Sequence, residues 1–105
     1  MTIPVDTKDA VIERIRATRH QLTSLGVKNI GLFGSFVKGR QVSTSDVDVL
    51  VEFIPEYHTF DNFMEVSFLL EEILGRRVEV VTPESLSPHI GPHILQELVR
   101  IDVAA

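Results

Sequence analysis

Two short motifs in this chain have residue types and spacing suited to chemistry. The first is Gly34-Ser35, which follows an apolar run and precedes a second glycine, Gly39. The second is the pair Asp46 and Asp48, which opens the next apolar run. A glycine turn lets the backbone approach an anion closely, and carboxylates are ligands that Mg²⁺ prefers. Together the motifs indicate metal-assisted phosphoryl chemistry.

The two aspartates could share an ion if they lie in one strand. Side chains two residues apart point to the same face, which places the Cα atoms of Asp46 and Asp48 about 6.5 Å apart. Both carboxylates could then reach one ion, or two ions about 3.5–4 Å apart. The alternative is that Asp46 caps a turn and Asp48 is merely exposed. Aspartate is depleted in strands, so a pair opening an apolar strand needs a further reason.

Composition narrows the class of protein. The 105 residues carry a formal net charge of -5 and contain no cysteine. Nucleic-acid binders usually need a basic surface, so long DNA or RNA is disfavoured as a ligand. The lack of cysteine excludes disulfides, thiolate zinc sites and cysteine nucleophiles. We expect a single domain over residues 1–105, with no signal peptide or membrane span and a cytoplasmic location.

Apolar periodicity and turn residues predict the elements that must position these motifs. The first element is a helix from Asp6 or Thr7 to about Leu25, and strands follow at 27–33 and 47–53. A second helix runs from Thr59 or Asp61 to Leu74 and leads to a strand at 78–81. The chain closes with a loop at 85–92 and a final helix carrying Ile94, Leu95, Leu98 and Ile101. Strands interleaved with helices favour a small α/β or α+β sheet with helices on one side. The glycine turn and the aspartates would then meet at one edge of that sheet.

The turn Gly34-Ser35-x-x-x-Gly39, followed by the aspartate pair, resembles the signature of the polymerase-beta-like nucleotidyltransferase superfamily. The short chain and residues 76–86 are similar to its minimal nucleotidyltransferase family in prokaryotes. The resemblance implies an α+β fold in which a small mixed β-sheet has helices packed on one face and the active site on the open face. It also implies transfer of a nucleoside monophosphate from a nucleoside triphosphate to a hydroxyl, with release of pyrophosphate.

Position by position, the resemblance implies nucleotide binding by the turn and metal binding by the carboxylates. The residues implied to hold the triphosphate are Gly34, Ser35, Lys38, Gly39 and Arg40. Those implied to bind metal and act in catalysis are Asp46, Asp48 and Glu79. Lys38 stands where the family often has arginine, which keeps the positive charge but loses the bidentate fork.

Glu79 is the largest departure from the family pattern, in which the third carboxylate is commonly an aspartate. In the family this carboxylate helps to deprotonate the acceptor hydroxyl and contacts the metal. Glutamate is one methylene longer, so nucleotide could bind while transfer is slow. The other interpretation makes Glu79 an exposed strand residue paired with Arg76 or Arg77, and the sequence leaves both interpretations open.

The expected function is magnesium-dependent transfer of AMP from ATP to a hydroxyl of a partner protein. The resemblance implies that the acceptor is a tyrosine of a helical HEPN-type toxin, with this chain as its antitoxin. The chain is too small to carry an acceptor-recognition domain, which supports a separate partner. The alternative is a weakly active or inactive nucleotide-binding module that neutralises its partner by direct binding. The sequence leaves a homo-oligomer open.

Overall fold

A four-stranded mixed sheet organises the chain in the computed structural model, which describes residues 2–104. The strand order is β3-β2-β1-β4, with bounds β1 (Val27–Phe33), β2 (Val47–Phe53), β3 (Val78–Val81) and β4 (Val99–Ile101). β1 is antiparallel to both β2 and β4, whereas β2 and β3 are parallel. The predicted α+β fold with a small mixed sheet is confirmed.

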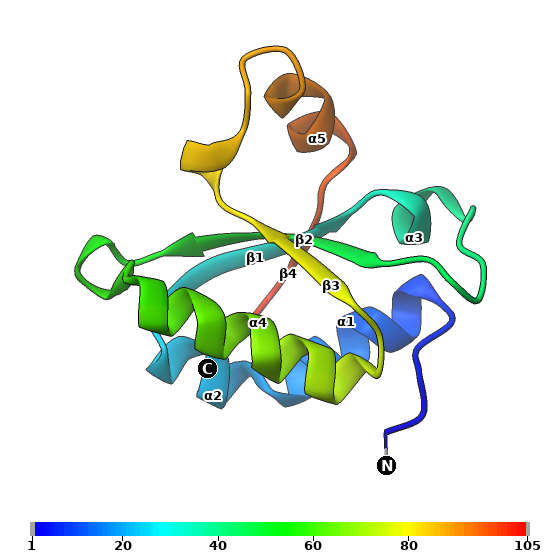
Figure 1. Cartoon of the computed structure of the whole chain (residues 1–105), viewed down its shortest axis with the longest axis horizontal. Coiled ribbons are helices and arrows are strands. Elements are labelled where there is room, and N and C mark those ends of the chain that lie inside the picture. The colour runs from blue at the N-terminus through cyan, green and yellow to red at the C-terminus, as the bar shows by residue number, and fades with distance from the viewer. Residues whose placement is uncertain (1, 105) are drawn as a thin grey trace.

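Three helices cover one face of the sheet, as Figure 1 shows. They are α1 (Lys8–Ala17), α2 (Arg19–Ser24) and α4 (Phe60–Leu74). The four-residue helix α3 (Ser35–Lys38) lies at the end of the sheet where β1 stops, and α5 (Gly91–Glu97) lies over the opposite face. Short 3-10 turns, η1 (Pro55–Tyr57) and η2 (Pro83–Ser85), complete the connections.

The hydrophobic core lies between the sheet and the covering helices. Alternate residues of β2 point into it, and Val47, Val49 and Val51 are fully buried, as predicted. The helices contribute residues at steps of three and four, which form one apolar stripe on each helix. The buried helical residues are Val11, Ile15, Leu22, Val66, Leu70 and Leu74.

The first predicted helix, from Asp6 or Thr7 to Leu25, is wrong in its continuity. It begins as expected, because the Thr7 hydroxyl accepts a hydrogen bond from Ala10 N at 3.1 Å. It is interrupted at Thr18, whose hydroxyl donates to Arg14 O at 2.9 Å. Threonine hydroxyls that bond to the preceding turn compete with the helical ladder, and here the chain restarts as α2.

The predicted final helix is also corrected. It was expected to carry Leu98 and Ile101, but α5 ends at Glu97 and the chain then forms β4 along the edge of β1. Val99 and Ile101 are β-branched and suit a strand, yet three residues are too few to show a period in sequence. By contrast, α4 agrees with the predicted helix and is capped by Thr59 and Gly75. Within residues 2–104 no helix is long and apolar enough to cross a membrane.

Candidate active site at the end of β1 and β2

The glycine turn joins β1 to α3 and lies against the second aspartate. Gly34 has φ +80° and ψ -152°, a backbone region that side-chain-bearing residues rarely adopt. A Cβ on Gly34 would overlap the Asp48 carboxylate. Gly39 ends α3 in the left-handed conformation, with φ +69°. Both predicted glycines are therefore required by backbone geometry, and Gly34 also makes room for a carboxylate.

Two of the three carboxylates come from neighbouring parallel strands. Asp48 is paired in register with Glu79 of β3, and on its other side with Phe33 of β1. The Asp48 and Glu79 carboxyl groups lie close enough to share a hydrogen bond when one of them is protonated. Asp46 lies one residue before β2 and is exposed. The topology thus brings Asp48 and Glu79 together, whereas Asp46, expected on the same strand as Asp48, lies just outside it. Within residues 2–104 no three acidic, histidine or cysteine side chains are grouped so that they could hold a metal ion.

Negative charge is concentrated around Asp48. Partial burial raises the pKa of the Asp48 carboxyl to about 6, helped by the hydrogen bond and charge of Glu79 and by the charges of Asp46 and Glu97. The raised pKa of Asp48 means that no nearby positive charge among the described residues balances the negative charge of these carboxylates. Oxygen donors on one sheet face, a glycine that leaves space beside them and this excess of negative charge fit a hard divalent ion such as Mg²⁺.

The two predicted basic ligands lie beside the turn in different settings. Lys38 Nζ is 3.3 Å from Glu97 Oε2 of α5, with both side chains partly exposed. Arg40 is exposed, and its backbone N–H donates to Ser35 O at 2.9 Å, closing the turn. Lys38 is therefore engaged with α5, and an incoming phosphate would compete with a carboxylate for it.

Arg76 organises the site, a role that the sequence did not reveal. Its guanidinium donates to the carbonyls of Val42, Ser43 and Ser45 at 3.0–3.2 Å, and also to Val5 O. It also lies 5.2 Å from the ring centre of Phe36 in α3. Arg76 thus holds both the loop before the aspartates and the helix after the turn.

The contacts of Arg76 help to decide whether Glu79 is paired with an arginine. The guanidinium of Arg76 is directed to backbone carbonyls and α3, whereas Glu79 lies beside Asp48. Glu79 is an exposed strand residue, as the other interpretation expected, but the ion pair with Arg76 or Arg77 that it also expected is not formed among residues 2–104. No sequence signal identified the role of Arg76, because its carbonyl partners are distant along the chain and carbonyls are common to every residue.

Residues 12–101 match the nucleotidyltransferase domain family. The chain belongs to this family. Protein adenylyltransferase MntA of Thermococcus cleftensis is 42% identical to this nucleotidyltransferase over 76 residues, which are 72% of this chain and 76% of that protein.

Solved structures agree with the fold of this nucleotidyltransferase. A structure described provisionally as a minimal nucleotidyltransferase is 32% identical, with a TM-score of 0.68 over 84% of this chain and 93% of that one. A toxin-antitoxin structure with AMP-PNP is 24% identical, with a TM-score of 0.60 over 80% of this chain and 72% of that one. At that level of identity the second likeness concerns the fold alone.

Proposed function

We propose that this nucleotidyltransferase transfers AMP from ATP to a hydroxyl, with tyrosine as the acceptor, on a partner protein. The observation that carries the proposal is the meeting of the Gly34 turn with the Asp48 carboxylate. It places a phosphate-sized turn beside a group of carboxylates. The 42% identity to a protein adenylyltransferase supports a protein, rather than a nucleic acid, as acceptor. The net charge of -5 supports the same choice.

The proposed roles follow from the placement of the residues. Gly34 and Ser35, with Lys38, Gly39 and Arg40 nearby, hold the triphosphate. Asp46, Asp48 and Glu79 bind one or two Mg²⁺ ions, which would neutralise charge on the phosphates. The acceptor oxygen forms a bond to the α-phosphorus, the bridging bond from that phosphorus to the β-phosphate oxygen breaks, and pyrophosphate leaves. Glu79, which lies beside Asp48 on the neighbouring strand, accepts the hydroxyl proton in its ionised form.

The proposed partner is a helical toxin of the HEPN type, with this chain acting as its antitoxin. The motif resemblance implies that pairing. A chain of the same fold is part of a toxin-antitoxin structure that contains AMP-PNP, which supports ATP as the nucleotide. The described residues amount to little more than the sheet, its helices and one short arm, so a separate protein would have to supply the acceptor.

Label transfer tests this proposal. The chain is incubated with Mg²⁺, the product of the adjacent gene and ATP labelled at the α-phosphorus, and in parallel with ATP labelled at the γ-phosphorus. We expect label on the partner from the α position only. Asp48→Asn should abolish transfer, whereas Glu72→Gln, an exposed change on α4, should not. Transfer from the γ position would instead indicate a kinase and would contradict the proposal.

A second candidate is the inactive nucleotide-binding module. Two observations favour it: the two proposed metal ligands Asp48 and Glu79 can share a hydrogen bond when one of them is protonated, and Glu97 engages Lys38. The same experiment separates the candidates. If the unmutated chain binds its partner and ATP but transfers no label, and Asp48→Asn leaves partner binding intact, the module is correct and the enzyme is not.

A further inference from the structure

A groove of about 420 Å³ lies on the open face of the sheet, and its lining includes Leu50, two residues beyond Asp48 in β2. Gly31 and Leu50 form its floor, and Leu95 and Leu98 form its wall. Leu50 follows Asp48 by two residues in β2, so both side chains lie on the same face of the sheet. Leu98 lies so close to Gly31 that a Cβ there would be 2.7 Å from its Cγ and Cδ1 atoms. The groove is therefore an extension of the candidate active site.

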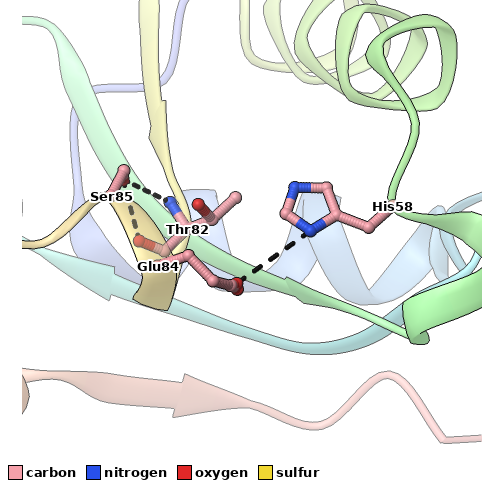
Figure 2. A network of polar contacts seen from close by, with 4 residues as sticks. All are labelled: His58, Thr82, Glu84 and Ser85. Atoms are coloured by element: carbon pink, nitrogen blue, oxygen red, sulfur yellow. Dashed lines mark hydrogen bonds and ion pairs between the residues drawn. The ribbon is translucent and has the colours of Figure 1, made fainter.

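The wall belongs to a C-terminal arm, residues 82–98, which is fastened at both ends. At its start Ser85 Oγ donates to Thr82 O at 2.8 Å and accepts from Thr82 N at 3.1 Å, while Glu84 Oε2 lies 4.0 Å from His58 Nδ1 (Figure 2). At its other end Glu97 is paired with Lys38 beside the turn. Apart from the turn within the arm, one partly exposed ion pair near each end thus joins the arm to the rest of the chain.

The end of the groove farthest from Asp48 is polar. Asn29 donates to Glu52 Oε1 and accepts from Arg100 Nη2 at 2.8 Å. All three residues line the groove, so a cation and a carboxylate face an occupant beyond the apolar floor. A ligand that suits the groove has an apolar part near Leu50 and hydrogen-bonding groups next to it. A side chain attached to peptide backbone has this pattern.

The chemistry of transfer determines which reactant lies on this side. In an in-line displacement the attacking and leaving oxygens are on opposite sides of the phosphorus. The turn at Gly34 is at the end of β1, where we place the pyrophosphate portion. β2 runs away from that end, from Asp48 past Leu50 to Glu52. The acceptor must therefore approach along the groove.

We propose that the groove holds the segment of the partner protein that carries the acceptor, with a tyrosine ring over Leu50 and beside Leu98. This inference rests on the proposed function. Leu50 and Asp48 are separated by one strand repeat, about 6.6 Å, so a hydroxyl held over Leu50 must project across that repeat to reach the carboxylates. A phenol projects by a full ring beyond Cβ, whereas a serine hydroxyl is one bond from Cβ. Glu52 and Arg100 then hydrogen-bond the backbone beside the tyrosine.

Matched substitutions on the arm test the groove. Leu95 lines it and is 57% exposed, and Ile90 is 58% exposed on the same arm but outside it. Leu95→Glu should raise KM for the partner at least about tenfold, since a carboxylate buried beneath a ring costs more than the ~1.4 kcal/mol that a tenfold change represents. Ile90→Glu adds the same charge and should leave KM unchanged. Equal KM values for both variants would overturn the proposal.

A binding measurement tests the groove without any transfer. Amide resonances of the ¹⁵N-labelled full chain are followed with Mg²⁺ and α,β-methylene-ATP, to which N-acetyl-tyrosinamide is then added. We expect the amides of Gly31, Leu50 and Leu98 to shift with the tyrosine amide and not with N-acetyl-serinamide. No shift at the solubility limit of the tyrosine amide would overturn the proposal, as would a shift of these amides by the nucleotide analogue alone.

The two measurements keep this inference separate from the proposed function. If the tyrosine amide shifts the groove but no label reaches the partner, the groove assignment stands and the transferase proposal fails. If label reaches the partner and Leu95→Glu behaves like Ile90→Glu, the transferase proposal stands and the groove assignment fails.

Discussion

The two faces of the sheet use one strand in opposite ways. On the covered face of β2, Val47, Val49 and Val51 are fully buried in the core between the sheet and the helices. On the open face the alternating residues are Asp48, Leu50 and Glu52, which we place in the site and the groove. Because side chains alternate between the two faces of a strand, successive residues of β2 serve the core and the proposed site in turn. The comparison teaches that changes on the covered face should affect folding, and changes on the open face should affect binding and transfer.

The largest effect on stability is expected from the covered face. Leu70 of α4 is fully buried in the core. Leu70→Ala should lower the free energy of unfolding by about 2–5 kcal/mol, because it removes buried methyl groups and leaves a cavity. Leu95→Ala on the open face should change it by less than about 0.5 kcal/mol. Urea unfolding measures both changes in free energy, and similar decreases for the two variants would contradict the different roles assigned to the two faces.

Arg76 connects the covered face to the site, so its removal should affect both stability and activity. Hydrogen bonds to a charged group contribute about 1.5–3 kcal/mol to stability. We expect Arg76→Ala to lower the free energy of unfolding by that amount. Since the loop before Asp46 would be released, transfer should also fall by about 10–100-fold, as for residues that position metal ligands. Hydrogen exchange of residues 42–45 and the transfer rate check the two effects. A loss of stability without faster exchange in this loop would contradict the role assigned to Arg76.

Unlike the two substitutions above, Asp48→Asn should increase the stability of the metal-free protein at a pH above the pKa of Asp48. The folded pKa of Asp48 is raised to about 6, above its ordinary value of 3.8, so the folded protein binds a proton more tightly than the unfolded chain does. The metal-free protein should therefore lose stability as the pH rises from about 4 to 6, and the asparagine variant should lose less. Mg²⁺ should remove part of the difference. Thermal unfolding across this pH range checks the expectation, and a pH dependence that is identical in the variant would contradict it.

The smallest effect is expected from the ion pair between the turn and the arm. Lys38 and Glu97 are partly exposed, and pairs of this kind contribute about 0.2–1 kcal/mol. A double-mutant cycle with Lys38→Met and Glu97→Gln should give a coupling free energy within that range at low salt and close to zero at high salt. An unchanged coupling at high salt would show that the pair is more shielded from solvent than the structure indicates.

Much of the site was predictable because its residues depend on local rules. Gly34 and the aspartates were recognisable from types and spacing, and the burial of Val47 and Val49 followed from strand alternation. The roles proposed for these residues stay predictions until transfer is measured. The break at Thr18 was less visible, because a threonine within a helical stripe can pack or bond backward, and only the folded chain decides between them.

The features that the sequence did not reveal depend on contacts between distant residues. β4 has three residues and becomes a strand only because the edge of β1 offers hydrogen-bonding partners. Arg76 finds its carbonyls because the loop before Asp46 returns to the same end of the sheet. The groove likewise needs Leu98 to lie over Gly31. No pattern within a short stretch of sequence specifies contacts between residues that are far apart along the chain.

The pairing of β4 with β1 also has a consequence for how the chain reaches its native state. Leu32 pairs with Val99, so the sheet cannot be completed until residues 99–101 have left the ribosome. The antiparallel pair of β1 and β2 has closer contacts along the chain and should form earlier, because non-local contacts are slow to form. Until then the outer edge of β1 presents unpaired backbone groups, an attractive template for strands of other chains. Once residues 99–101 pair with β1, this edge is covered and is no longer open to strands of other chains.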